Sequence, residues 1–279
     1  MNRLFKIIKS SKVRLADFST IGIGEVSRVF FPKNALEIIE IYKNCKDPFP
    51  IGGGSNTLFS DVSKRLFFSD RDLPKRVDID GRRVVVSSNT TISELGKILV
   101  KKGLGGLEFL MGIPAHLGGL VKMNASAYGY SISDFIEFVE IVDKRGVCRR
   151  KTNKFVYRGS DIDGFILSVA LKLKKSSKDE VQSFTNETIK KRLARQPLKK
   201  MSIGCIFKNP QNTSAGYLLE KCGLKGKSFG DVAISKQHAN FFVNRGKASF
   251  EDMTKLIEYA RNRVYQEFNI ELELEIKIA

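Results

Sequence analysis

Two segments rich in small residues constrain the fold of this chain more than any other feature. The first, PFPIGGGSNTLFSD at 48–61, places three consecutive glycines between apolar stretches. The second, GIPAHLGGLVKMNASAYG at 112–129, contains eight Gly, Ala or Ser residues. Residues without bulky side chains let the backbone approach another surface closely. Two separate segments of this kind suit a large cofactor that contains a diphosphate.

The glycines of the first segment belong to neither of two common phosphate-binding motifs. No Gly-Lys-Ser or Gly-Lys-Thr follows them, which excludes a P-loop. The residues after them, at 57–70, have a strand pattern, whereas a Rossmann fingerprint needs a helix there. Consecutive backbone N–H groups can still form an anion nest, with side-chain donors from Ser55 and Asn56. From this segment alone, a plain tight turn is an equal alternative.

The composition is that of an ordinary globular protein. The chain has 279 residues, of which 42% are hydrophobic and 10% aromatic, enough for two or three modest domains. No apolar run approaches the ~18 residues of a membrane span. Charges interrupt the N-terminal stretch before an apolar signal region forms. We therefore expect a cytoplasmic protein without membrane insertion.

The cysteines and histidines do not suggest a metal site or a disulfide framework. The four cysteines have no C-x-x-C spacing, and the only two histidines, His116 and His238, lie in different segments. A zinc site needs clustered ligands. We therefore expect no bound metal.

The formal net charge of +18 leaves three interpretations open. A basic chain can bind nucleic acid, but the Lys and Arg residues here are dispersed, and no basic arm, zinc-finger motif or RNP motif accompanies them. A solvated lysine-rich surface is the simplest interpretation. A positive field that attracts small polyanions, such as dinucleotides and nucleotide sugars, is the third.

The secondary-structure signals predict an α+β chain, with the main break near residue 180. Hairpins are predicted around Asp80-Gly81 and within 140–150, and a strand within 164–175. The polar stretch 174–183 is the best linker candidate. Helices are predicted at 34–45, 91–103, 214–223 and 250–268, and another that ends near Gln196-Pro197. The alternating segment 270–279 predicts a final strand.

Seven segments together resemble one enzyme family. They are GGGSN, the second small-residue segment, YRGS (157–160), GCIFKNP (204–210), AGYLLEKCGLKG (215–226), ISKQHANFFVN (234–244) and LELEIKI (272–278). Their order and spacing are similar to those of UDP-N-acetylenolpyruvoylglucosamine reductases, also called UDP-N-acetylmuramate dehydrogenases. The resemblance covers nearly the whole chain. The length is similar to that of the shorter family form, which lacks an extra tyrosine-bearing loop.

The resemblance implies a fold of the p-cresol methylhydroxylase and vanillyl-alcohol oxidase type, followed by a substrate domain. A first FAD-binding subdomain would span 1–75 and be joined by the C-terminal strand 271–279. A second would span 76–177, and an α+β substrate-binding domain would span 178–270. FAD would be held without a covalent bond. The implied cofactor-binding residues are Gly52, Gly53, Gly54, Ser55, Asn56, Thr57, Gly112, Ile113, Pro114, Gly118, Gly119, Asn124, Ala127, Gly129 and Ile166.

The implied reaction belongs to peptidoglycan synthesis. NADPH reduces FAD, and the flavin N5 delivers hydride to C3 of UDP-N-acetylglucosamine enolpyruvate. The charge that develops beside the carboxylate needs stabilisation, and C2 needs a proton. By resemblance, Arg158 polarises the carboxylate, helped by Glu275, which must carry or share a proton. Glu271 and Glu273 are expected at exposed positions.

Cys205 is the main departure from the family, which usually has a serine at this position. A thiol, with a reference pKa of about 8.5, is a stronger acid than an alcohol. We therefore expect Cys205 to donate the proton to C2. A packing cysteine is the alternative.

The remaining expectations concern the substrate and the assembly. Lys208 and Asn209 are candidates for binding the substrate's diphosphate or sugar, and Tyr128 and Tyr157 for lining the substrate side. His238 and Asn240 are expected to organise the interior of the substrate domain. His116 is unexpected at its position in the second small-residue segment.

We expect a monomer that binds no nucleic acid. The runner-up interpretation is another FAD-dependent oxidoreductase of the same superfamily with a different substrate. A basic nucleic-acid-binding protein is a third interpretation, which explains the charge and nothing else.

Overall fold

The computed structural model describes residues 7–150 and 154–279. Helices and strands alternate irregularly along the chain, which confirms the expected α+β class. Two compact units can be distinguished. The first comprises Met1–Lys12, Arg28–Gly53 and Arg65–Lys191, and the second comprises Val13–Ser27, Gly54–Lys64 and Arg192–Ala279.

A five-stranded antiparallel sheet forms the centre of the first unit. Its order is β12-β11-β15-β7-β6, with bounds Gly146–Arg150, Ile136–Asp143, Phe165–Lys172, Arg83–Ser87 and Val77–Asp80. Both predicted hairpins, β6–β7 and β11–β12, are confirmed, as is the strand within 164–175.

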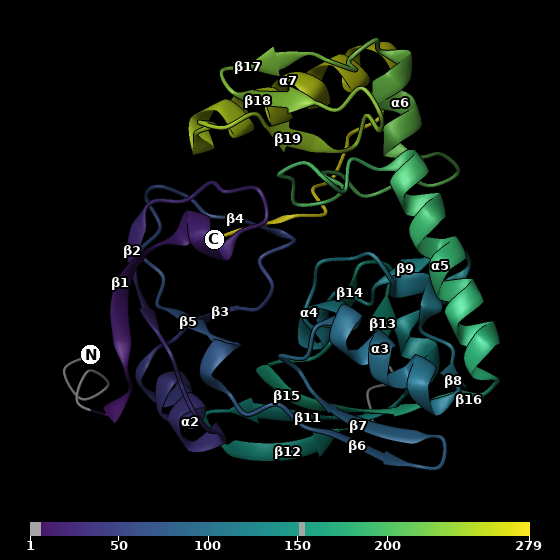
Figure 1. Cartoon of the computed structure of the whole chain (residues 1–279). Coiled ribbons are helices and arrows are strands. Elements are labelled where there is room, and N and C mark those ends of the chain that lie inside the picture. Colours follow the sequence, from purple (N-terminus) through teal and green to yellow (C-terminus); the bar gives the residue numbers. More distant parts are fainter. Residues whose placement is uncertain (1–6, 151–153) are drawn as a thin grey trace. The chain divides into compact units, whose positions relative to one another are not determined.

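Helices α3 (Ile92–Lys102) and α4 (Leu117–Lys122) pack against this sheet (Figure 1). α3 begins and ends as predicted, with a Thr91–Glu94 capping box and Gly103 in the left-handed conformation. The sequence does not predict α4, because two of its six residues are glycines, which disfavour helix. Apolar residues of both helices join those of the strands in one core.

A second sheet has the order β1-β2-β5-β3, with bounds Ser10–Arg14, Val26–Phe30, Phe67–Ser69 and Phe49–Ile51. β5 pairs in parallel with β2 and with β3. α2 (Ala35–Asn44) begins at the predicted N-cap, Asn34, whose side chain accepts a hydrogen bond from the Glu37 amide. Ile38 and Ile41 of α2 are fully buried in a core with Phe30 and Phe68.

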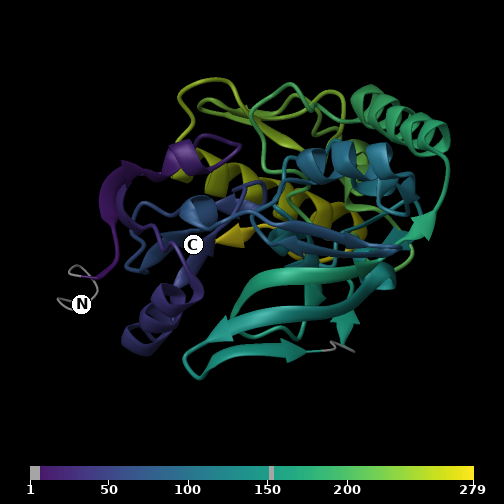
Figure 2. The ribbon, with the colours of Figure 1, turned by 60° about the horizontal axis from the view of Figure 1, so that its bottom comes forward.

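Short elements complete the first unit. Three two-stranded pairs are β8 (Leu104–Gly105) with β16 (Lys174–Lys175), β9 (Ser126–Ala127) with β10 (Tyr130–Ser131), and β13 (Phe155–Val156) with β14 (Gly159–Ser160). The 3-10 helices η2, η3 and η4 span Asp70–Asp72, Glu108–Leu110 and Ile132–Phe135. Strands β11, β12 and β15 run side by side in both views (Figures 1 and 2).

The second unit is built around a three-stranded antiparallel sheet, β17-β18-β19, with bounds Ser228–Phe229, Val232–Ile234 and Phe242–Asn244. Helices α6 (Ala215–Lys221) and α7 (Phe250–Phe268) confirm two predicted helices and share its core. The 3-10 helix η1 spans Leu15–Phe18. β20 (Lys277–Ile278) pairs in parallel with β4 (Thr57–Leu58), so the end of the chain returns to its N-terminal part.

Two expectations were wrong. The proposed linker, 174–183, instead contains β16 and the start of α5 (Lys178–Arg195). Ser177 and Glu180 cap this helix reciprocally, because each side chain accepts a hydrogen bond from the other's amide. The segment 270–279 is strand only at β20, although Leu274 forms an isolated bridge with Phe207.

Candidate functional site

The first small-residue segment lies between β3 and β4, and part of it contacts the second. A Cβ atom added at Gly53 would lie 3.2 Å from the Ala115 Cα, the His116 N and the Pro114 O. Those neighbours are backbone atoms, which have little room to move. The two small-residue segments therefore meet in the first unit, at a point where only glycine fits easily.

The rest of the first segment, from Gly54, belongs to the second unit. Gly54 has a φ of +62°, and a Cβ there would lie 1.8 Å from the Phe18 carbonyl oxygen. Asn56 donates from Nδ2 to the Glu275 carbonyl oxygen at 3.3 Å, and Thr57 pairs with Lys277 in β4–β20. Ser55, between Gly54 and Asn56, is half-buried.

The second segment forms three consecutive pieces of the first unit. Gly112, Ile113 and Pro114 follow η3, Gly118 and Gly119 lie in α4, and the remaining residues, Asn124, Ala127 and Gly129, follow α4 and enter the β9–β10 hairpin. Ile166 lies in β15, where its side chain is buried in the main core. The cofactor roles of these residues stay predictions.

Several buried polar atoms near these segments suit a polar cofactor. Asp70 Oδ1, Ser88 Oγ, Asn89 Oδ1 and Thr90 Oγ1 have no hydrogen-bond partner among the described residues. The Ser88 and Thr90 carbonyls accept from the Gly118 and Leu117 amides at the start of α4. Buried polar atoms usually have partners, supplied by the protein, by water or by a ligand. These atoms, beside the two small-residue segments, fit a bound FAD.

Arg158 lies in the turn of the β13–β14 hairpin, with a φ of +57°. Its Nη1 donates to the Ser126 Oγ at 3.1 Å and to the Ser126 carbonyl oxygen at 3.3 Å. Asn124 donates from Nδ2 to the Val156 carbonyl oxygen at 3.1 Å. These bonds hold the hairpin against the second small-residue segment. The predicted Arg158 and the cofactor segment are therefore neighbours in the first unit.

Tyr128 and Tyr157 lie in the same region and are both about half exposed. The Arg158 guanidinium carbon lies 5.1 Å from the centroid of the Tyr157 ring. Tyr128 has a φ of +54°. The substrate-lining role of the two tyrosines stays a prediction.

Cys205 and Glu275 lie on neighbouring segments of the second unit. The Glu275 amide donates to the Ile206 carbonyl oxygen at 2.8 Å. Cys205 itself forms a backbone bridge with Phe241. Among the described residues Cys205 forms no disulfide, and it is half-buried, as is Glu275, whereas Glu271 and Glu273 are exposed as expected. The structure thus brings the two segments together, and the position of Arg158 relative to them stays a prediction.

Lys208 and Asn209 follow Cys205 on the same segment. Lys208 Nζ lies 2.9 Å from Glu273 Oε2, and this contact lowers the pKa of Glu273. Asn209 Oδ1 accepts from the amide of Ala215, the first residue of α6, at 3.1 Å. Asn240 is buried and bonds both backbone groups of Phe207, which confirms its expected interior role.

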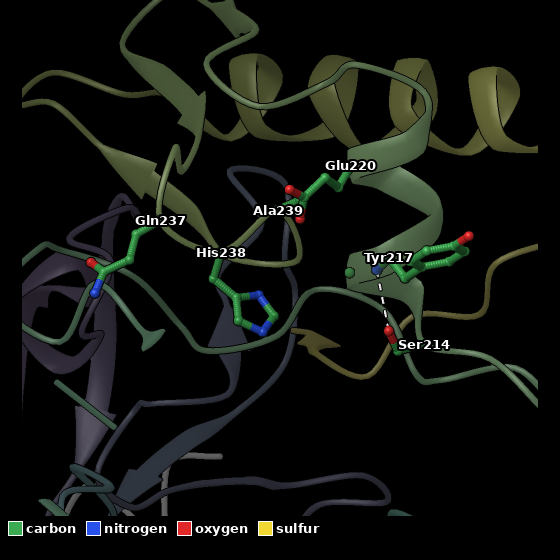
Figure 3. A pocket seen from close by; sticks show the side chains of 7 residues that line it. Ser214, Tyr217, Glu220, Gln237, His238 and Ala239 are labelled. Atoms are coloured by element: carbon green, nitrogen blue, oxygen red, sulfur yellow. Dashed lines mark hydrogen bonds between the residues drawn. The ribbon is translucent and has the colours of Figure 1, made fainter. Parts of the chain in front are cut away.

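A pocket of about 260 Å³ lies in the second unit beside the start of α6 (Figure 3). It is lined by Ser214, Gly216, Tyr217, Glu220, Gln237, His238 and Ala239. Burial, and then the charge of Lys225, lowers the pKa of His238, so the neutral imidazole is favoured. His238 Nδ1 accepts from the Asn240 amide, at 3.2 Å. His238 therefore both supports the interior and lines a pocket.

The sequence gives no signal for several of these residues. Ser126 bonds Arg158 across 32 residues of chain, and Asp70 reaches His116 across 46. From the sequence, Ser214 can be predicted only as a helix N-cap. It lines a pocket because Gln237 and His238, from a distant segment, lie opposite it. Contacts between distant segments are set by packing, which local patterns do not encode.

Among the described residues, no group of His, Cys, Asp and Glu side chains could hold a metal ion. Over the same residues, every helix is too short or too polar to cross a membrane.

Comparison with known proteins gives matches over most of the chain. Residues 26–151 match the FAD binding domain, and residues 196–279 match the C-terminal domain of UDP-N-acetylenolpyruvoylglucosamine reductase. The reductase of Thermotoga sp. (strain RQ2) is 36% identical over 274 residues, covering 95% of this chain and 91% of that protein. The reductase of Clostridium novyi (strain NT) is 33% identical, covering 96% and 91%.

A solved structure agrees with these relatives. The crystal structure of UDP-N-acetylenolpyruvylglucosamine reductase from Thermus caldophilus has a TM-score of 0.84 and 32% identity, covering 98% of this chain and 99% of that one. These matches confirm the expected fold, an FAD-binding part followed by the C-terminal domain of the family, and FAD as the cofactor. The chain belongs to the UDP-N-acetylenolpyruvoylglucosamine reductase family.

Proposed function

We propose that this chain catalyses the FAD-dependent, NADPH-consuming reduction of UDP-N-acetylglucosamine enolpyruvate to UDP-N-acetylmuramate, in peptidoglycan synthesis. Family membership and the FAD-binding match support the reaction. One structural observation supports the residue roles most directly. The Glu275 amide donates to the carbonyl oxygen of Ile206 at 2.8 Å, and Ile206 directly follows Cys205, the predicted acid.

Bound FAD would supply the hydride that adds to C3 of the enolpyruvyl group. Hydride addition next to a carboxylate leaves negative charge on C2 and on the carboxylate oxygens. Two tasks then fall to the protein: this charge needs electrostatic stabilisation, and C2 needs a proton.

Arg158 is proposed to stabilise the carboxylate. Its guanidinium is permanently charged and offers several donors in a fixed plane, which matches the two oxygens of a carboxylate. The bonds from its Nη1 to Ser126 orient the guanidinium beside the second small-residue segment. Glu275, carrying a proton, would donate to the same carboxylate and relieve the repulsion between two anions.

Cys205 is proposed to donate the proton to C2. Cys205 forms no disulfide among the described residues and is half-buried, so its thiol is partly shielded from bulk water and still reachable. Lys208 and Asn209, three and four residues later, would bind the diphosphate or the sugar. The contact of Asn209 with the first residue of α6 connects it to the pocket of Figure 3, which we propose receives part of the nucleotide sugar. Tyr128 and Tyr157 would line the substrate on the side of Arg158.

The domain limits and the state in solution are part of the same proposal. We propose FAD-binding subdomains at 1–75 with 271–279, and at 76–177, followed by a substrate domain at 178–270. Pairing of β20 with β4 supports the return of the C-terminal segment. The protein would act as a cytoplasmic monomer that binds no nucleic acid. Sedimentation at working concentration tests the monomer.

An anaerobic assay of the purified protein tests the reaction. NADPH oxidation should require the enolpyruvyl sugar, and the product should be heavier than the substrate by two hydrogen atoms. NADPH oxidation that is indifferent to the sugar would point instead to another flavin-dependent oxidoreductase. A colourless protein that releases no FAD on denaturation would contradict both.

A further inference from the structure

A buried carboxylate and a histidine meet beside the first glycine of the cofactor segment. His116 Nδ1 lies 2.8 Å from Asp70 Oδ2, and the two side chains are 17% and 4% exposed. A Cβ added at Gly52 would lie 3.7 Å from Asp70 Oδ2 and 3.8 Å from His116 Nδ1. The pair therefore lies directly against the backbone of the glycine loop.

Both side chains are fixed by the backbone around them. Asp70 begins η2, directly after β5. His116 is the N-cap residue of α4, and it forms a backbone bridge with Thr91 at the start of α3. Asn89 donates from Nδ2 to the Asp70 carbonyl oxygen at 3.2 Å. The imidazole is thus held at one nitrogen by a residue that cannot easily move.

The same place holds polar atoms that need partners. The Asp70 residue is 3% exposed, and its Oδ1 has no hydrogen-bond partner within the described part of the chain. Three more side-chain atoms also lack a hydrogen-bond partner among the described residues: Ser88 Oγ, Asn89 Oδ1 and Thr90 Oγ1. Ser88 and Thr90 bond the start of α4, and Asn89 bonds Asp70. A ligand or bound water near the glycine loop would supply the hydrogen-bond partners that these buried polar atoms need.

Charge favours an anionic ligand for His116. Neither 48–61 nor 112–121, the part of the second segment before Lys122, contains a lysine or an arginine, so His116 is the one side chain in these two stretches that can become a cation. A hydrogen bond between the imidazole Nδ1 and a carboxylate fixes the ring orientation and directs Nε2 away from the carboxylate. In the imidazolium form, Nε2 also has a hydrogen to donate.

We propose that His116 is a cofactor-binding residue, oriented by Asp70 through Nδ1 and donating from Nε2 to the diphosphate of FAD. The contact is non-covalent. A donor charge beside the glycine amides would complete the diphosphate site with a charge-assisted hydrogen bond, which is stronger than a neutral one. This contact rests on the proposed binding of FAD and not on the roles of Arg158, Cys205 and Glu275. If His116 does not bind the diphosphate, the proposed reaction can still take place.

Titration of FAD into the apoprotein, followed by flavin fluorescence, tests the contact. His116→Gln should weaken FAD binding by about ten- to a hundredfold, the range of one charge-assisted hydrogen bond. Asp70→Asn should weaken it by a smaller factor, because Nε2 stays near the diphosphate. Asp72→Asn, on the same 3-10 helix as Asp70, is the matched control and should bind FAD as the wild type does. Wild-type affinity in His116→Gln would overturn the proposal.

A spectroscopic measurement on the wild-type sequence covers the case in which His116→Gln does not fold. With ¹⁵N-labelled histidine only two imidazoles contribute, and the His238→Gln variant assigns the signals of His116. Adding FAD should shift the His116 Nε2 resonance. The ³¹P resonances of the bound diphosphate should differ between wild type and folded His116→Gln. An unchanged Nε2 signal, or flavin that remains attached to denatured protein, would contradict the proposed contact.

Discussion

Arg158 occupies a backbone conformation that residues with side chains seldom adopt. Its φ of +57° is matched by Asn124 and Tyr128, with φ of +43° and +54°, in the segment to which the Arg158 hairpin is bonded. Left-handed non-glycine residues cost about 1–3 kcal/mol each and concentrate at functional sites. The YRGS motif predicts Arg158 as a site residue. It does not predict the Ser126 contact that holds it, because that bond joins two separate hairpins.

Gly54 allows a direct comparison of two left-handed glycines. Its φ is +62°, and that of Gly81, in the β6–β7 turn, is +56°. A Cβ at Gly81 meets nothing within 4 Å, whereas one at Gly54 would overlap the Phe18 carbonyl. Gly81→Ala should therefore cost about 1–2 kcal/mol of conformational strain, and Gly54→Ala clearly more. Thermal unfolding of the two variants checks this, and equal melting temperatures would show that the loop yields without cost.

At the scale of helices, capping residues predicted where several helices begin. Asn34, Thr91 with Glu94, and Ser214 mark helix starts that the structure contains. The same signal is present at Ser177 and Glu180, in the segment taken as a linker. Because α5 lacks an apolar stripe, the polar composition of its first residues suggested a linker in spite of the cap. The alternation of apolar and charged residues at 270–279 likewise predicted that Leu272 and Ile276 are buried, but it could not predict which strand this segment pairs with.

The cap of α3 predicts a measurable pH dependence. A hydrogen bond from Lys75, then one from the Thr91 amide, lowers the pKa of Glu94 to about 2. Because the folded pKa lies below the ordinary value of 4.5, the ionised carboxylate stabilises the fold above about pH 4.5. That contribution is lost as the pH falls toward 2.

Glu94→Gln should reduce stability near neutral pH by about 1 kcal/mol or less, since Glu94 is 48% exposed. The difference from the wild type should shrink as the pH falls through that window. Urea unfolding at several pH values measures it, and Lys75→Met should reproduce part of the effect. A difference that is constant from neutral pH to acid would contradict the assigned cause.

For the whole molecule, family motifs were more informative than composition. The net charge of +18 left three interpretations open, whereas seven ordered segments predicted the family that the comparisons confirm. The division into units was less predictable, since it falls at Lys191–Arg192, inside α5, where no loop or glycine marks it. Each unit also gathers segments far apart in sequence, as Gly54–Lys64 and Arg192–Ala279 do in the second.

The proposed proton donor, Cys205, distinguishes this chain from a family member with serine at the same position. Half-buried Cys222 provides a matched control, because it too is outside any disulfide of the described residues and lies on the far side of α6 in sequence from the Cys205 segment. Loss of a general acid slows a reaction by about 10²–10⁴-fold. A serine hydroxyl can replace the thiol as a donor, whereas a methyl group cannot.

Stopped-flow reoxidation of NADPH-reduced enzyme by the enolpyruvyl sugar, compared among Cys205→Ala, Cys205→Ser, Cys222→Ala and wild type, is the most direct test. We expect Cys205→Ala to be slowed by about 10²–10⁴-fold, with Cys205→Ser retaining substantial rate and Cys222→Ala matching the wild type. Wild-type reoxidation in both Cys205 variants, with FAD fully bound, would contradict the assignment of Cys205 as the acid.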